Sequence, residues 1–158
     1  MMDKNEAVIE FLLTCPTIQE NPLFFNFADI EAGSNHVATQ TDTIKKRYID
    51  GSVLKTYTFT IACYKAVSHN AIVGTSSFGD ENMENMAIVQ DILDWINEQA
   101  DNRVYPNFGT DYIVEDMATL SVDPDLDGID TSVNPPLARY SIGVKIEYLD
   151  NTKILWNN

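Results

Sequence analysis

The acidic stretch from Asp123 to Pro136 holds the residue spacing closest to a known chemical site. Three aspartates at alternate positions, followed by a glycine, match the first half of a calcium-binding loop, in which carboxylate oxygens surround a hard cation. The twelfth position is Asn134, which cannot supply the bidentate carboxylate that completes such a loop. The stretch is therefore interpreted as a solvated loop between strands, and a calcium-responsive binding module is the alternative. The residues concerned are Asp123, Asp125, Asp127, Gly128 and Asp130.

The two histidines and the two cysteines do not form a catalytic or metal-binding pattern. His36 and His69 lack a second histidine or a carboxylate at the spacing that zinc sites use. Cys15 and Cys63 lie in apolar patterns, which favours reduced thiols in the core of a protein made in the cytoplasm. Residues 74–79 are rich in glycine and serine but lack the lysine of a phosphate-binding loop. We therefore expect no enzyme activity, no cofactor and no metal.

The charge of the chain excludes several classes of partner. Ten basic and 24 acidic side chains give a net charge of −14 over 158 residues. Such a chain repels phosphate backbones, so a module that reads DNA or RNA sequence is not expected, nor is docking on anionic membranes. The N-terminal apolar run, 7–13, is too short and too acidic in its surroundings for a signal peptide, and no run reaches membrane-spanning length. The chain is of a size to form a single domain, 1–158, around one core.

A long β-hairpin is the strongest local prediction. Asp50–Gly51 can adopt the positive φ angles of a two-residue turn. Alternation after this turn predicts a strand to about Val67 with one apolar face. The side chains of that face are Tyr57, Phe59, Ile61 and Cys63.

Two amphipathic helices are predicted to cover the sheet. The first runs from Asp3, which suits an N-cap, to about Thr14, because Pro16 cannot continue it. The second begins near Asp80 or Asn82, and we expect it to cover the Tyr57 face of the hairpin strand. The apolar positions of the two helices are Val8, Phe11, Leu12 and Cys15, and then Met86, Val89, Ile92, Leu93, Ile96 and Ala100.

Strands alternate with these helices along the rest of the chain. Leu23–Phe27 is an aromatic segment that either packs on the first helix as a strand or forms a patch covered by another subunit. The final strand, Ala138–Tyr148, shows the cleanest alternation in the sequence. The pattern predicts an α+β fold, in which a largely antiparallel or mixed sheet with a long β-hairpin is covered by two main helices. Other expected features are turns at 33–35 and 105–109, loops at 68–78 and 123–136, and strands at 37–44 and 112–122.

Five short motifs follow one another along nearly the whole chain, from about residue 4 to residue 150. They are Lys46–Ser52, Tyr57–Phe59, the helix from Asn82 to Ile96, Asp127–Gly128 and Ala138–Ile142. Their order resembles that of the tail terminator, or head–tail joining, proteins of tailed bacteriophages that infect Firmicutes.

This resemblance implies a non-enzymatic structural protein that assembles as a ring, typically a hexamer. The ring would cap the tail-tube protein and offer a surface to the head connector or neck, in the virion or in a phage-derived particle without a head, after assembly in the host cytoplasm. A head-completion or minor capsid protein at the capsid vertex is the alternative within the same class. DNA would pass through the ring without sticking if the channel is acidic, a hypothesis that a neutral or basic channel would exclude.

Three surfaces are the candidate contacts with other subunits or partners, because loops and hairpin tips that project beyond a sheet are common contact points. The basic cluster beside the hairpin turn is expected to pair with carboxylates nearby or on a neighbouring subunit. The candidates are Lys45, Lys46, Arg47, Tyr48, Ile49 and Leu54 at the hairpin tip, the Phe24, Phe25 and Phe27 cluster, and Asp123, Asp125 and Asp127 in the acidic stretch.

Overall fold

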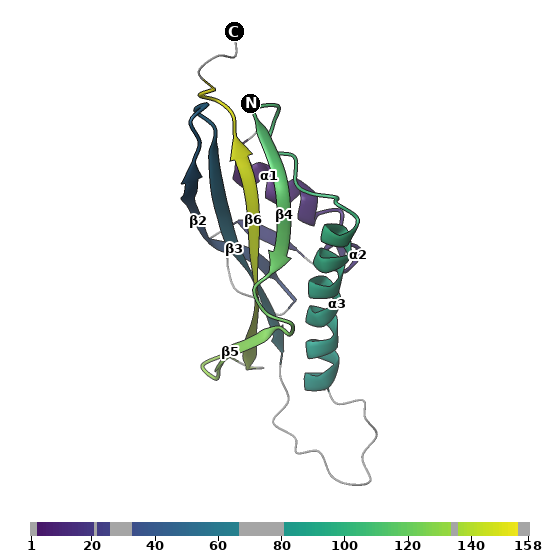
Figure 1. Cartoon of the computed structure of the whole chain (residues 1–158). Helices are drawn as coiled ribbons and strands as arrows, with labels where there is room; N and C mark the ends of the chain where they lie inside the picture. Colours follow the sequence, from purple (N-terminus) through teal and green to yellow (C-terminus); the bar gives the residue numbers. More distant parts are fainter. Residues whose placement is uncertain (1–2, 21, 26–32, 67–80, 134–135, 155–158) are drawn as a thin grey trace.

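A computed structural model describes residues 3–20, 22–25, 33–66, 81–133 and 136–154. Within these ranges the chain forms a mixed β-sheet with its helices on one side, and the opposite face of the sheet carries no helix (Figure 1). The predicted α+β fold is confirmed. The elements are α1 (Lys4–Leu12), α2 (Pro16–Gln19), β1 (Leu23–Phe25), β2 (Asn35–Arg47), β3 (Val53–Ala66), α3 (Glu81–Asp101), β4 (Tyr112–Thr119), β5 (Asp125–Asp130) and β6 (Leu137–Asp150).

Strand β6 is the central strand of the sheet. It pairs antiparallel with β3 along its whole length, from Leu137 opposite Ala66 to Asp150 opposite Val53. Its other edge is shared, because β5 pairs with its first residues and β4 with its last. The strand order is β1-β2-β3-β6-β4, and the β1–β2 pair alone is parallel among the described strands. The inward side chains of β6 are buried as predicted: Ala138, Tyr140, Ile142, Val144, Ile146 and Tyr148.

The β2–β3 turn differs from the predicted two-residue turn. The Tyr48 N–H donates to the Ser52 carbonyl at 2.9 Å, and the Gly51 N–H donates to the Tyr48 carbonyl at 3.1 Å. Gly51 alone in this loop has a positive φ, +94°. A three-residue loop that ends in a left-handed glycine needs only one positive φ, which suits Asp50 because its carboxylate instead accepts from the Ser52 N–H.

Helix α1 and the short helix α2 follow from local signals. The Asp3 side chain accepts from the Asn5 N–H at 3.2 Å and so caps α1, whose predicted apolar face is buried. Pro16 does end the first helix, but it also begins α2, which the sequence analysis did not predict. Proline fits the first turn of a helix because the missing N–H has no intrahelical partner there.

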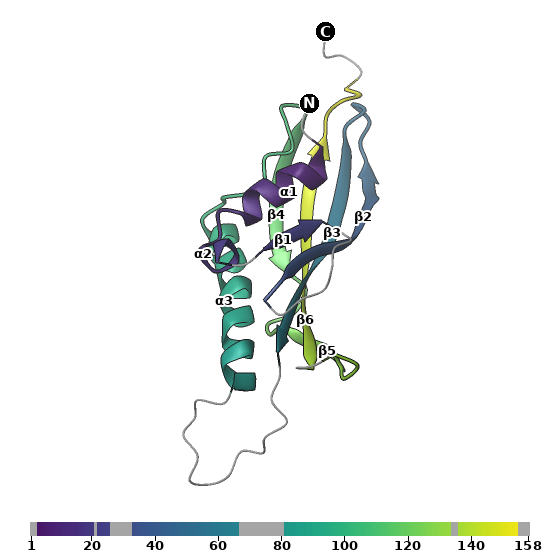
Figure 2. The same ribbon diagram turned by 180° about the vertical axis from the view of Figure 1, so that it is seen from behind.

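Helix α3 buries Val89, Ile92, Leu93 and Ile96, as its periodicity predicts. It packs mainly against β4, and Figure 2 shows α1 crossing the same side of the sheet at the end of β6 that pairs with β4. The Tyr57 end of the hairpin face is therefore covered by α1 and not by α3. The predicted cap at Asp80 and the loop at 68–78 lie outside the described residues.

Phe108 belongs to the core, although the sequence analysis assigned it to a turn. Its side chain is 2% exposed and packs edge-to-face against Tyr148, with ring centroids 5.2 Å apart, and against Tyr57 at 5.8 Å. The segment between α3 and β4 thus folds over the sheet and supplies an aromatic ring to the core. No periodic pattern marks an isolated core residue of this kind.

Three further predictions of local structure need correction. The turn predicted at 33–35 is limited to Gly33, with φ +88°, because Ser34 and Asn35 are buried and β2 already starts at Asn35 beside β1. A β-bulge between Val114 and Asp116 shifts the alternation of β4, which ends at Thr119 and does not reach 122. The acidic stretch predicted as a loop contains β5, because pairing with β6 holds Asp125–Asp130 extended.

We expect Phe108→Ala to lower the free energy of unfolding by about 3–5 kcal/mol, because a buried ring leaves a cavity between Tyr57 and Tyr148. Urea denaturation followed by circular dichroism measures this change. Glu98→Ala is the control, since Glu98 is exposed on α3 and its loss should change stability by less than about 0.5 kcal/mol. Equal denaturation midpoints for Phe108→Ala and the natural chain would contradict the assignment of Phe108 to the core.

Candidate functional site

The tip of the β2–β3 hairpin presents apolar side chains to solvent. Ile49 stands at the start of the three-residue loop and is almost fully exposed, and Tyr48 beside it is partly exposed. The Lys46 ammonium lies 5.1 Å from the centroid of the Tyr48 ring, a cation–π contact that holds the ring at the surface. Exposed apolar groups on a rigid turn are typical of a contact site.

Three outward-facing residues extend this apolar surface across the sheet. Leu149 pairs in register with Leu54 on β3 and with Ile113 on β4, on the face that carries no helix. An open groove of about 530 Å³ lies where Leu149 meets the hairpin loop, and Tyr48 and Ile49 line it. We call this surface the tip patch: Tyr48, Ile49, Leu54, Ile113 and Leu149.

Basic side chains lie on both faces of the hairpin tip, with Lys46 on the side of the tip patch and Arg47 on the other side, and they differ in whether they have a partner. Lys45 Nζ pairs with Glu147 Oε1 at 2.7 Å, and this hydrogen bond raises the pKa of Lys45. Within the described residues Lys46, Arg47 and Lys153 have no ion pair. The predicted pairing of the basic cluster with nearby carboxylates is therefore confirmed for Lys45 alone.

Lys55 and Asp150 form an ion pair on the helix-covered side of the hairpin tip. The Lys55 Nζ lies 2.8 Å from Asp150 Oδ2, and the Thr152 N–H and hydroxyl donate to the other carboxylate oxygen. Burial raises the pKa of Asp150, but these hydrogen bonds lower it by more, to about 2. Arg47 and Lys153 line a cavity of about 180 Å³ next to this pair. The pair anchors the end of β6 to β3.

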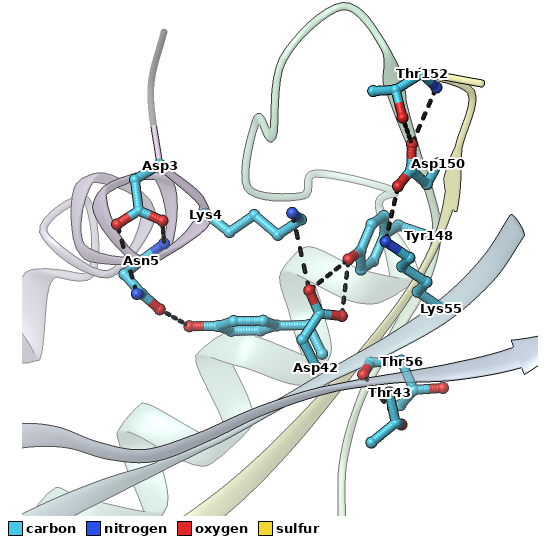
Figure 3. Close-up of polar contacts among 11 residues, drawn as sticks. Asp3, Lys4, Asn5, Asp42, Thr43, Lys55, Thr56, Tyr148, Asp150 and Thr152 are labelled. Atoms are coloured by element: carbon cyan, nitrogen blue, oxygen red, sulfur yellow. Dashed lines mark hydrogen bonds and ion pairs between the residues drawn. The ribbon is translucent and has the colours of Figure 1, made fainter.

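A polar cluster that the sequence analysis missed joins helix α1 to the sheet (Figure 3). The Tyr148 hydroxyl lies 2.8 Å from both Asp42 carboxylate oxygens, and the Lys4 ammonium is 3.8 Å from the same group. The Tyr57 hydroxyl donates to Asn5 on α1. Burial, followed by the hydrogen bond to Asp42, raises the pKa of Tyr148, so its phenol stays protonated at neutral pH. The cluster therefore ties α1 to β2, β3 and β6.

The acidic stretch does not have the geometry of a calcium loop. All six residues of β5 are exposed, and an extended strand cannot wrap a cation. Asp127 Oδ2 accepts from Arg139 Nη1 at 3.0 Å, and Asp130 accepts from the Ser132 N–H. Across the described residues no three His, Cys, Asp or Glu side chains converge on a common point where a metal ion could bind. Among the described residues, Asp123 and Asp125 have no ion pair.

The aromatic cluster lies at a different place from the hairpin tip. Phe24 and Phe25 form most of β1, which runs beside the start of β2, whereas the tip follows the end of β2. The strand predicted at Leu23–Phe27 is confirmed for Leu23–Phe25. The Phe24 ring is tilted against that of His36, with centroids 5.3 Å apart, and Phe25 is partly exposed. Phe27 lies outside the described residues.

Burial holds His36, Cys15 and Cys63 in their neutral forms. Burial, and then the charge of Arg139, lowers the pKa of His36, which contacts the Ser34 hydroxyl at 3.1 Å. Burial raises the pKa of Cys15, and it raises that of Cys63 to about 12, so neither free thiol supplies a thiolate at neutral pH. His69 lies outside the described residues.

No family model matches the chain, and no curated protein gives a significant match. In the part of the chain that the structure describes, no helix is both long and apolar enough to cross a membrane. The contact residues predicted from the sequence lie on three separate surfaces: the hairpin tip, β1, and the acidic stretch that contains β5.

We expect Asp150→Asn to lower the free energy of unfolding by about 1 kcal/mol at pH 7, because it weakens the bonds from Lys55 and Thr152. The folded pKa of about 2 lies below the ordinary 3.8, so the carboxylate stabilises the fold above pH 3.8 and loses this effect as pH falls through 2. Denaturation of both proteins between pH 7 and about pH 2 should show the difference vanish. Glu98→Gln, at an exposed residue of α3 without an ion pair among the described residues, is the control. A difference that grows on acidification would contradict the stabilising role of the Asp150 carboxylate.

Proposed function

We propose that this chain is a non-enzymatic structural protein of the tail terminator type, whose copies assemble into a ring. The tip patch carries the proposal. It places exposed apolar side chains, Ile49 above all, on a rigid hairpin end where no other described part of the chain covers them. A surface of this kind is stabilised when a second protein covers it.

The open edge of the sheet supports the same proposal. Beyond Val37, no described strand pairs with the outer edge of β2, which continues to Arg47. Free backbone N–H and C=O groups along an edge strand attract other chains unless they are covered. In a ring each copy covers surfaces of its neighbour, so the edge and the tip patch are both protected from unspecific association.

The partners of such a ring follow from the resemblance described above. One face of the ring would cap the tail-tube protein and the other would meet the head connector or neck protein, in a virion assembled in the bacterial cytoplasm. The charge of −14 opposes tight binding of nucleic acid and is compatible with DNA that passes through the ring. No catalytic group is needed for this function.

We expect the purified protein to form closed rings, seen by negative-stain microscopy, with a mass by light scattering that is a multiple of 17.8 kDa and is about 107 kDa for a hexamer. Where assembly requires tail tubes, the rings should appear at tube ends. Ile49→Asp should reduce ring formation because it places a charge in the apolar contact. Leu13→Asp, at an apolar residue on the helical side that is 46% exposed, is the control and should assemble normally. A protein that stays monomeric and does not bind tube ends would refute the proposed function.

A further inference from the structure

We infer that the tip patch and its basic residues bind the β5 end of a second copy, so that copies associate head to tail. The inference rests on the proposed function in one respect, that copies of the chain associate. It adds which two surfaces meet and why they recognise each other. The β5 end is defined here as the acidic and apolar surface formed by 120–133.

The charges of the molecule are separated along the sheet. Half of the ten basic side chains gather at the hairpin tip. Glu147 and Asp150 there are paired with Lys45 and Lys55, and Asp50 in the loop accepts hydrogen bonds from Ser52. At the β5 end the acids outnumber the bases, and Arg139 alone forms an ion pair with them among the described residues. Asp123 and Asp125 are exposed and have no ion pair there. The basic side chains at the tip are Lys45, Lys46, Arg47, Lys55 and Lys153.

These two surfaces are too far apart to attract each other within one molecule. The β3–β6 pairing has Val53 opposite Asp150 at the tip and Ala66 opposite Leu137 at the β5 end. A strand of that length spans roughly 40 Å, which is several Debye lengths at physiological salt. Figure 1 shows the hairpin tip and β5 at opposite ends of the sheet. The complementary charges can therefore meet only between two copies.

Both surfaces also contain exposed apolar side chains at their centres. On β5, Leu126 and Ile129 are each about half exposed, and Val122 before the strand is more exposed still. The tip patch offers Ile49 and Tyr48 in the open groove. An apolar centre with a charged rim is the usual composition of a specific interface, in which burial supplies affinity and charge supplies orientation.

The charge pattern opposes the symmetric alternatives. A contact of tip with tip brings together the unpaired Lys46, Arg47 and Lys153 of both copies, and a contact of β5 with β5 brings together two acidic surfaces. Like charges placed opposite each other destabilise a complex. Two different surfaces on one molecule form a head-to-tail contact, which repeats until it closes as a ring or extends as a filament.

Two charge-reversal variants and their mixture test this contact. The tip variant carries Lys46→Glu and Arg47→Glu, and the β5 variant carries Asp123→Lys and Asp125→Lys. Sedimentation velocity should give each variant alone an association constant at least about tenfold below that of the natural chain. An equimolar mixture should recover association. In the mixture the tip of the tip variant, which is now acidic, meets the β5 end of the β5 variant, which is now basic.

Controls separate this effect from changes in fold or in net charge. Glu98→Lys with Asp101→Lys changes the net charge as the β5 variant does, at exposed residues of α3, and should leave association unchanged. Circular dichroism of each variant should match the natural chain, since all four reversed residues are exposed. Recovery in the mixture cannot come from unfolded proteins, so it remains decisive if a variant is less stable.

The outcomes distinguish the contact from the proposed ring. If the natural chain associates and either variant does so equally well, or if the mixture shows no recovery, the tip-to-β5 contact is wrong while the ring proposal stands. If the mixture recovers but microscopy shows only open filaments, the contact is right and the closed ring is wrong. A natural chain that is monomeric alone and on tail-tube ends refutes both.

Discussion

The antiparallel pairing of β3 with β6 is the constraint on which the rest of the structure depends. Its register places Tyr57, Phe59 and Ile61 on the same side as the inward row of β6, and this shared face forms the core beneath the helices. A slip of one residue would turn every apolar side chain of a strand toward solvent, so burial fixes the register strongly. Helix α1, Phe108 and β4 all pack against this pair, and the Asp42–Tyr148 contact ties the second strand to it.

The same pairing determines where the exposed features lie. Because the two strands are long and straight enough to hold both ends of the sheet apart, the basic tip and the acidic β5 end cannot neutralise each other in one molecule. Because both edges of β6 are occupied and the helices cover one face, the tip patch remains on the uncovered side. The proposed structural role depends on surfaces that fit another copy of the chain.

The sequence predicts the elements whose apolar side chains recur at a regular spacing. It does not predict the features that depend on contacts between distant parts of the chain. The inward row of β6 and the stripe of α3 are legible because burial imposes period 2 or 3.6 on apolar residues. Strand β5 is not, since aspartate and glycine favour loops and only pairing with β6 extends them. Phe108 and Asp42 each contact Tyr148, which lies far from both in the sequence, so no local pattern reveals these contacts. Of the candidate contacts, the tip was predictable from its turn, whereas the extension of its apolar surface to Ile113 and Leu149 required the strand register.

Disulfide cross-linking of two single-cysteine additions tests the central claim, head-to-tail association through the tip and β5, most directly. Ile49→Cys and Leu126→Cys are exposed positions, whereas the native Cys15 and Cys63 are buried and do not interfere. Under mild oxidation, head-to-tail association should give a covalent dimer when the two variants are mixed and little dimer when either variant is oxidised alone. Efficient dimers of the Ile49→Cys variant with itself, and none with Leu126→Cys, would show that copies meet tip to tip and would contradict the account.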